Sequence, residues 1–544
     1  MKSNKYLLLF LMFMGLSTSC KDELDVKNPN QPTPESAATP TGITKLAQGG
    51  VYYNGFVLDT YYDGVTGTFF AGPVGFHELM GDVVGAEAAN EYLNQIGCPN
   101  AVVLDNGTNV PNPQNPNTQY ALLRGVNSNA QQGQNPTYHE WAYMYSLNNA
   151  CNNVLALVDK VTYTSGNADV QKNTIKAWCY WWKGFAYSRL GSIYYAGVIS
   201  NDPNATNGVY LSKEKLIAEA NANFDKAANL LKGLSAGGDY DATVKALIPD
   251  FCRVGKGGII PPDAWIRSIN TFKARNILVN NTVATMTAAQ WSSILDLTNN
   301  GIKSTDLIFT GRSNANADIW SGTSGSVAAK ATGDPGGATY KISERLIQDF
   351  KTGDKRLDNN FVKGTPWIGN SDRGQSFNTR YALKSGGTGI AGVAVYSNTV
   401  AGAQELYIAG SYDENELMKA EAKIYSADIE GGLTIIDAIR TAQGAGLAAV
   451  KGTSLALAAA KEELRLERRC GLAFRGLSFY DARRWGVIDP TGGRTNCVVL
   501  DKAGAVNTKA KIIYGFLDYW DVPDNELAYN PAAAGSDPIV NPKK

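Results

Sequence analysis

The clearest pattern along the chain is the recurrence of apolar residues in steps of three and four, which is the spacing of one face of an α-helix. Polar stretches rich in Gly, Asn, Ser and Pro separate the segments that carry this pattern, notably 95–136, 321–338 and 385–403. Strand patterns are sparse and short, so the predicted class is mainly α with long loops. The pattern predicts helices over 138–158, 173–195, 213–231, 264–279, 288–299, 414–426, 433–441 and 454–474.

Two consecutive predicted helices, 173–195 and 213–231, resemble the two helices of a tetratricopeptide repeat. Gly184 lies between aromatic residues in the first and Phe224 lies between alanines in the second, so a small residue can interlock with a large one. A long insertion separates the two helices, and any amphipathic pair can show such spacing by chance. We predict a scaffold of tetratricopeptide-like helical repeats whose long loops form a ligand-binding region.

The N-terminus has the composition of a secretory signal. Lys2 and Lys5 precede an apolar run over 6–16, which is too short to cross a bilayer because a crossing takes roughly 20 residues. Small residues then lead to Cys20, as in a bacterial lipobox, although the usual leucine stands one position early at Leu16. An ordinary cleavable signal with an incidental cysteine is the alternative interpretation.

We predict lipoprotein processing, with a signal peptide over 1–19 and lipidation of Cys20. Acyl chains on this cysteine would supply the stable attachment that multi-chain anchoring gives. The segment 20–40 is polar and proline-rich, which is typical of a tether between the lipid and the folded body. The mature protein is therefore expected to be anchored to a membrane and not inserted in it.

Charge and composition narrow the classes of ligand and chemistry. Lys and Arg total 50, and Asp and Glu also total 50, so no long-range field favours nucleic acid or an anionic membrane surface. Recognition should instead depend on shape, stacking and hydrogen bonds. His77 and His139 are the only histidines, and the seven cysteines form no CxxC pair. We therefore predict no metal site and no cofactor, and buried free thiols for most cysteines.

Several motifs that suggest enzymes lack the context their chemistry needs. GxGxxG at 387–392 follows no strand and is interpreted as a flexible loop. GxSxG at 233–237 follows a helix and has no histidine after it, so its glycines are interpreted as helix-end and turn residues. The charged run 461–469 is interpreted as a solvated helix face. A glycosidase is harder to exclude, because it needs only two carboxylates in one cleft.

The segment 464–486 reads as a charged amphipathic helix that ends near Gly476, followed by an aromatic cluster. Asp481 can pair with Arg483 or Arg484. The residues predicted to lie in the core rather than to contact ligand are Phe474, Tyr480 and Trp485.

This segment resembles the C-terminal signature of the SusD/RagB family of nutrient-capture lipoproteins, ER…LaFEG…yfDLrRWG. Gly471 and Arg475 replace two acidic residues of that signature, so no buried ion pair is expected there. ELMKAEA at 416–422 resembles a family helix, and VPDNELAYNP at 522–531 resembles the closing motif of the family. The residues that fit the signature are Glu467, Arg468, Leu472, Ala473, Phe474, Gly476, Tyr480, Asp481, Arg484, Trp485 and Gly486.

The resemblance implies a SusD-like helical-repeat region over 41–250 and a C-terminal SusD/RagB region with loop-rich insertions over 251–544. It implies a lipoprotein on the outer face of an outer membrane that captures oligosaccharide and delivers it to a SusC-type TonB-dependent transporter. It implies no enzymatic activity. The alternatives are a RagB-like lipoprotein that captures peptide, a surface glycoside hydrolase, and a lid without a ligand of its own.

Aromatic residues that no helix face accounts for are the candidate ligand contacts, because sugar C–H faces stack on aromatic rings. Trp320 precedes a Gly/Ser-rich loop, Trp367 lies between turn residues, and Tyr92 precedes the longest polar loop. These loops carry no motif that transfers from the family. The alternative is that each ring fixes its own loop to the body, and Trp320 is the first candidate.

Overall fold

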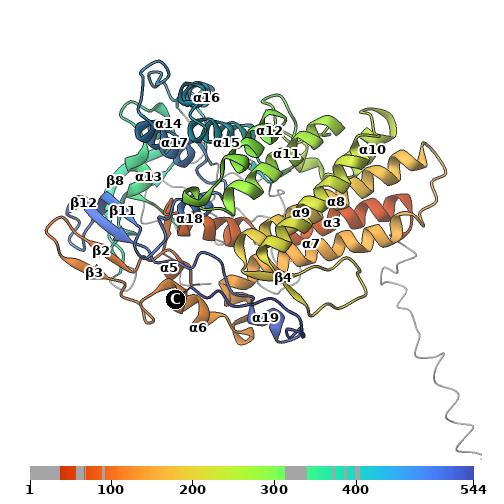
Figure 1. Ribbon diagram of the computed structural model, residues 1–544, viewed down its shortest axis with the longest axis horizontal. Coiled ribbons are helices and arrows are strands. Elements are labelled where there is room, and N and C mark those ends of the chain that lie inside the picture. Colours follow the sequence, from red (N-terminus) through yellow and green to blue (C-terminus); the bar gives the residue numbers. More distant parts are fainter. Residues whose placement is uncertain are drawn as a thin grey trace, which may run out of the picture.

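The structure is a computed structural model of the 544-residue chain that describes residues 37–56, 67, 69–87, 92–312, 340–370, 374–384, 389–397 and 405–543. The predicted signal peptide, Cys20 and Trp320 lie outside the described residues. Helices make up most of the described part, which confirms the mainly α class (Figure 1).

Each helix that the apolar spacing predicts is present. Two of them, α8 and α16, begin four or more residues earlier than predicted, because a polar side chain caps the first turn: Asn167 accepts from Asp169 N before α8, and Asp428 accepts from Gly431 N before α16. The helices are α7 Pro136–Val158, α8 Ala168–Ile193, α9 Lys213–Leu231, α11 Pro262–Val279, α12 Ala288–Asn299, α15 Tyr412–Tyr425, α16 Ile429–Ala442 and α17 Leu457–Gly471.

Other helices escaped prediction because they are short or rich in glycine. The longest is α3, Pro40–Phe56, in which glycines interrupt the apolar face. Gly50 faces Ala150 and Gly55 faces Tyr143, so the missing side chains let α3 approach α7 closely. The remaining helices are α4 Gly75–Met80, α5 Leu93–Ile96, α6 Gln119–Val126, α10 Gly238–Leu247, α13 Glu344–Asp349, α14 Lys355–Asn360, α18 Ser478–Arg484 and α19 Asp524–Leu527.

The long helices pack in a row, each against the next. α3, α7, α8 and α9 lie side by side, and the row continues through α11, α12, α15, α16 and α17 (Figure 1). α8 and α9 interlock at Gly184, because a Cβ there would lie 2.6 Å from the Phe224 ring. The interior beside it is aromatic, and the fully buried Trp178 and Trp181 both pack against Phe309.

Strands are few and short within the described residues. The sheet with the most strands has the order β11-β12-β2-β3 and is antiparallel throughout, so it joins the two ends of the chain. Stretch 95–136, predicted as loop, contains two of these strands and α6. The strands are β1 Val84–Ala86, β2 Ala101–Val103, β3 Asn109–Pro111, β4 Ala196–Val198, β5 Tyr210–Ser212, β6 Thr310–Gly311, β7 Tyr340–Ile342, β8 Phe361–Trp367, β9 Thr379–Leu383, β10 Leu406–Tyr407, β11 Arg494–Leu500 and β12 Val506–Ile513.

The main hydrophobic core extends through the row of helices and takes residues from Ile43 to Val522. It therefore draws on both of the regions that the sequence suggested, 41–250 and 251–544. Among the helices of the described residues, none combines the length and the apolar composition that a bilayer crossing requires.

Candidate functional site

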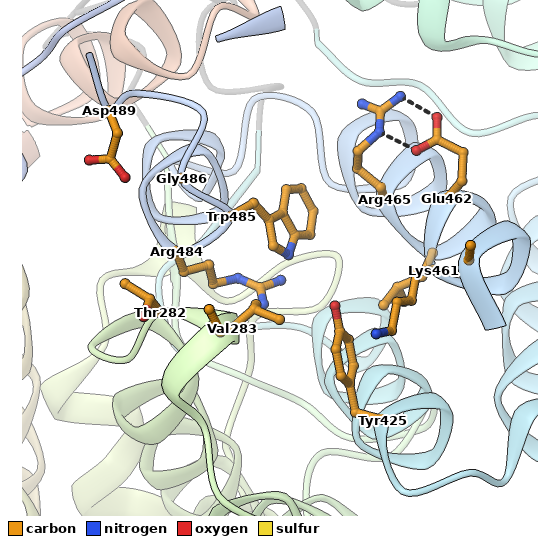
Figure 2. A pocket seen from close by; sticks show the side chains of 13 residues that line it. Thr282, Val283, Tyr425, Lys461, Glu462, Arg465, Arg484, Trp485, Gly486 and Asp489 are labelled. Carbon is orange, nitrogen blue, oxygen red and sulfur yellow. Dashed lines mark hydrogen bonds and ion pairs between the residues drawn. The ribbon is translucent and has the colours of Figure 1, made fainter. Parts of the chain in front are cut away.

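A cavity of about 620 Å³ opens between the ends of α15 and α18, one face of α17 and the loop after α11 (Figure 2). This volume lies within the range of small-molecule sites, about 300–1,000 Å³. Tyr425 is the last residue of α15, Lys461 and Arg465 lie on α17, and Trp485 follows α18. The wall is thus assembled from helices that are distant in sequence.

A buried ion-pair cluster fixes one wall of the cavity. Arg484 donates from Nη2 to Glu421 Oε2 at 2.7 Å and from Nε to Asp481 Oδ1 at 2.7 Å. Asp481 also accepts from Arg468 Nε at 2.9 Å, so two arginines and two carboxylates balance in charge. The Arg484 guanidinium lies 4.5 Å from the centre of the Trp485 ring. The indole is therefore backed by a cation that cannot move away from its partners.

Trp485 lines this cavity, so its assignment to the core is wrong. Phe474 and Tyr480 are 3% and 2% exposed, as predicted for core residues, whereas Trp485 is only half-buried. The cause is local: α18 ends at Arg484, and the chain turns at Gly486 with φ 70°. The indole consequently projects from the helix end into the space between α18 and α17 (Figure 2).

The opposite wall carries Tyr425, which is held between two groups. Its ring stacks on Trp291 with centroids 4.7 Å apart, and Lys461 Nζ lies 4.1 Å from its ring centre. The hydroxyl points into the cavity (Figure 2). Burial raises the pKa of Tyr425 to about 12, so this hydroxyl stays neutral and can donate a hydrogen bond.

A second cavity of about 400 Å³ shares Glu462 and Arg465 with the first. Arg465 donates from Nη2 to Glu462 Oε1 at 2.7 Å and to Asp349 Oδ1 at 2.9 Å. The Glu462–Arg465 pair is therefore a wall that both cavities have in common. Arg494 lines the far cavity only.

The interpretation of 461–469 as a solvated face is wrong for its second half. Glu467, Arg468 and Arg469 are 1%, 3% and 4% exposed. Glu467 accepts from Arg356 Nη1 at 2.6 Å and from Arg440 Nε at 2.8 Å. Partners far away in sequence neutralise these charges, which is why a run of charged residues could enter the interior.

His77 and Glu78 lie on α4, and both are buried with displaced pKa values. Burial, together with nearby Arg189, lowers the pKa of His77 to about 4, against the opposing effect of Glu140. Burial raises the pKa of Glu78 to about 7, although Gly476 N donates to its carboxylate at 2.7 Å. The ring of His77 packs edge-on against Tyr480 at 4.8 Å, so these groups join α4 to α18 inside the core.

The predicted ligand contacts are placed as follows. Trp320 lies outside the described residues. Trp367 is half-buried at the end of β8, and Lys341 Nζ lies 4.4 Å from its ring centre. Tyr92 precedes α5 with φ 57° and packs half-buried against the main core. Neither lines the cavity beside Trp485, and the loop site stays a prediction.

Sequence reasoning missed Tyr425 and Lys461, because each sits on an ordinary amphipathic helix. The available signal was the spacing of Lys461 and Arg465 by four residues, which puts both on one face of α17. For GxSxG and the cysteines the structure agrees with expectation, whereas residues 387 and 388 of GxGxxG lie outside the described residues. Gly237 has φ 101° at the start of α10, and the six cysteines among the described residues are buried and free. No group of three or more His, Cys, Asp or Glu is placed there to hold a metal ion.

The chain matches no protein-family model and no curated protein sequence. It is similar in structure to a SusD-like carbohydrate binding protein from Bacteroides vulgatus, with TM-score 0.54 and 15% identity, over 92% of this chain and 99% of that one. A SusD superfamily protein from Parabacteroides distasonis gives TM-score 0.57 and 14% identity, over 92% and 98%. A SusD-like carbohydrate binding protein from Bacteroides fragilis gives 0.52 and 14%, over 86% and 99%. From its first long helix to its C-terminal motifs, the chain therefore has the SusD-like fold.

Proposed function

We propose that the protein is a nutrient-binding lipoprotein of the SusD/RagB family that captures oligosaccharide at the cell surface. The observation that carries this proposal is the similarity, over nearly the whole chain, to solved structures described as SusD-like carbohydrate binding proteins. At this low identity the fold alone transfers, so the ligand has to be argued from the site and tested.

The motifs behind the family resemblance support the proposal, because they converge in space. Glu421 belongs to the 416–422 motif, and Arg468, Asp481 and Arg484 belong to the C-terminal signature, yet they form one cluster. The closing motif at 522–531 also contacts the helical body, since Trp141 Nε1 on α7 donates to Glu526 Oε2 at 3.2 Å. The family pattern thus describes contacts that hold this fold together.

The two departures from the signature fit this view. Gly471 offers its carbonyl oxygen to Gln443 Nε2 at 3.0 Å, and Arg475 donates from Nη1 to the Glu405 carbonyl at 3.0 Å. The Arg475 guanidinium also lies 4.1 Å from the centre of the Tyr407 ring. Neutral acceptors and an aromatic ring take the place of ion pairs at these sites.

The ligand is tested most directly by affinity electrophoresis on a panel of purified polysaccharides and by calorimetry on peptides. Retardation by a glycan, with no product released in a hydrolysis assay, is the expected result. Binding of peptide alone would favour the RagB-like alternative. Release of shorter sugars would make the protein a glycoside hydrolase, and the absence of any ligand would favour the lid.

Delivery needs a partner, and we propose a SusC-type TonB-dependent barrel in the outer membrane. The protein, anchored through Cys20, would cover the barrel and release ligand into it. The native lipoprotein should then co-purify with a barrel protein after extraction in mild detergent. Recovery of a lone monomer at native expression would contradict this part of the proposal.

A further inference from the structure

The cavity beside Trp485 combines an aromatic platform with a single cation that lacks a carboxylate. Arg484 is neutralised by Glu421 and Asp481, and Arg465 by Glu462 and Asp349. Lys461 is the only cation of the cavity lining for which the described residues supply no carboxylate. The Lys461 Nζ atom lies 4.1 Å from the centre of the Tyr425 ring.

We propose that this cavity binds a saccharide that carries one anionic group, with a sugar ring against Trp485 and the anion on Lys461. The inference rests on the proposed function, because it names the class of sugar that the protein captures. The volume of about 620 Å³ accommodates a short oligosaccharide rather than a single small ion. The neutral Tyr425 hydroxyl between these two groups supplies a hydrogen bond to a sugar hydroxyl.

Preorganisation favours a ring at Trp485. The indole lies against a guanidinium that Glu421 and Asp481 hold in place, so little side-chain freedom is lost when a ligand stacks on it. Across the cavity, the stack of Tyr425 on Trp291 keeps the opposite wall rigid in the same way. A sugar ring against Trp485 would cover indole surface that would otherwise remain in contact with water.

The same lining argues against a polyanion. Glu462 and Asp489 also line the cavity, so a second negative charge on the ligand would meet a carboxylate instead of a lysine. Lys461 can therefore pair with one anionic group of the ligand, and the described residues of the cavity lining offer no second unpaired cation for another. The preferred ligand thus bears a carboxylate or a sulfate on one sugar and hydroxyl groups on its neighbours.

The test compares oligosaccharides of equal length by calorimetry: one neutral, one with a single uronate, one with a single sulfate and one sulfated on every sugar. The singly charged ligands should bind on the order of tenfold more tightly than the neutral one, and the difference should shrink as salt rises. Whether uronate or sulfate binds better identifies the natural anion. Equal binding of neutral and singly charged ligands would overturn the inference, and so would the tightest binding by the polysulfated ligand.

Variants place the site. Lys461→Met should abolish the preference for the charged ligand while the affinity for the neutral one is kept, and Lys461→Arg should restore the preference. Trp485→Ala should weaken both ligands roughly tenfold. Lys423→Met, on neighbouring α15 and outside the cavity, is the matched control and should change neither affinity nor preference. Thermal melting checks that each variant is folded.

The outcomes separate this inference from the proposed function. If the unaltered protein binds a glycan but Lys461 and Trp485 variants bind it equally well, the cavity is not the site, and the function stands. If Trp320→Ala alone abolishes binding, the cavity is again not the site, and the proposed function stands. If the unaltered protein binds no saccharide, both fail, and binding of peptide carboxylates through Lys461 would also overturn the saccharide assignment.

Discussion

Glu421 and Arg484 form a two-pronged ion pair in the interior, with both carboxylate oxygens accepting from guanidinium nitrogens at 2.5 and 2.7 Å. Neither side chain has any exposed surface. The pair joins α15 to the end of α18 and supports the ring of Trp485 beside it. Stability and the shape of the cavity wall therefore depend on the same contact.

Arg484→Met should lower the free energy of unfolding by about 3–5 kcal/mol, because it leaves the Glu421 carboxylate buried with Arg468 Nε no closer than 4.0 Å. Urea denaturation measures this loss. Lys423→Met is the control on α15, the helix that carries Glu421. Lys423 pairs with the half-exposed Asp428, so the cost of this variant should stay below about 1 kcal/mol. Similar small losses in both variants would contradict the role of the buried pair.

Gly184→Ala should destabilise the protein by about 1–3 kcal/mol, because the added Cβ would lie 2.6 Å from the Phe224 ring between α8 and α9. The helix propensity gained from alanine, about 1 kcal/mol, only partly offsets this clash. Gly49→Ala is the matched control within α3, where no atom lies within 4 Å of the new Cβ, and it should stabilise. Thermal or urea unfolding distinguishes the two signs, and a stabilised Gly184→Ala would disprove the interlock.

Glu78→Gln should stabilise the protein at alkaline pH but not at acid pH. The folded pKa of Glu78 is raised from 4.5 to about 7, so the native state binds more protons than the unfolded chain in this window. The contribution of Glu78 to the free energy of unfolding thus falls as pH rises from 4.5 to 7. Glutamine does not titrate, so the variant should match the parent near pH 4.5 and exceed it by about 3 kcal/mol at pH 8.

The comparison of parent and variant also removes the effect of His77. Its folded pKa is lowered to about 4, so its contribution to stability is lost as pH falls from 6.5, in both proteins alike. Urea unfolding across pH 4.5 to 8.5 gives the difference directly. Parallel profiles for the two proteins would show that Glu78 is charged in the folded state.

Cys20→Ala should release the protein from the membrane fraction, because the prediction makes this cysteine the site of the acyl anchor. Fractionation and immunoblotting measure the shift from the outer-membrane pellet to the soluble fraction. Ser19→Ala keeps a small residue before the cysteine and should leave the protein in the pellet. A Cys20→Ala protein that still sediments with outer membranes in high salt would contradict lipid anchoring.

The loop prediction stays open and has its own test. Trp320→Ala should weaken glycan binding roughly tenfold or more and leave the melting temperature nearly unchanged. Trp367→Ala and Tyr92→Ala are the companion variants, and both rings contact the body through Lys341 or the core. Full affinity in all three single variants by calorimetry would place the site elsewhere, and the cavity beside Trp485 would then be the remaining candidate.

The sequence by itself determined the class and most of the long helices, because apolar spacing and capping act within a few residues. It also determined the order of the family-like motifs. It failed at α3, where glycines interrupt the apolar face, since close approach to α7 is a property of two helices and not of one.

Only the tertiary structure decided which charged residues are buried and where the cavity lies. Glu467 and Lys461 stand in one charged run, yet the first lies among two arginines in the interior and the second faces the cavity. Trp485 likewise lies outside the core, because α18 ends one residue before it and the indole lines the cavity. The free energy of a buried charge or an exposed ring depends on partners brought from distant segments, and local spacing along the chain carries no record of them.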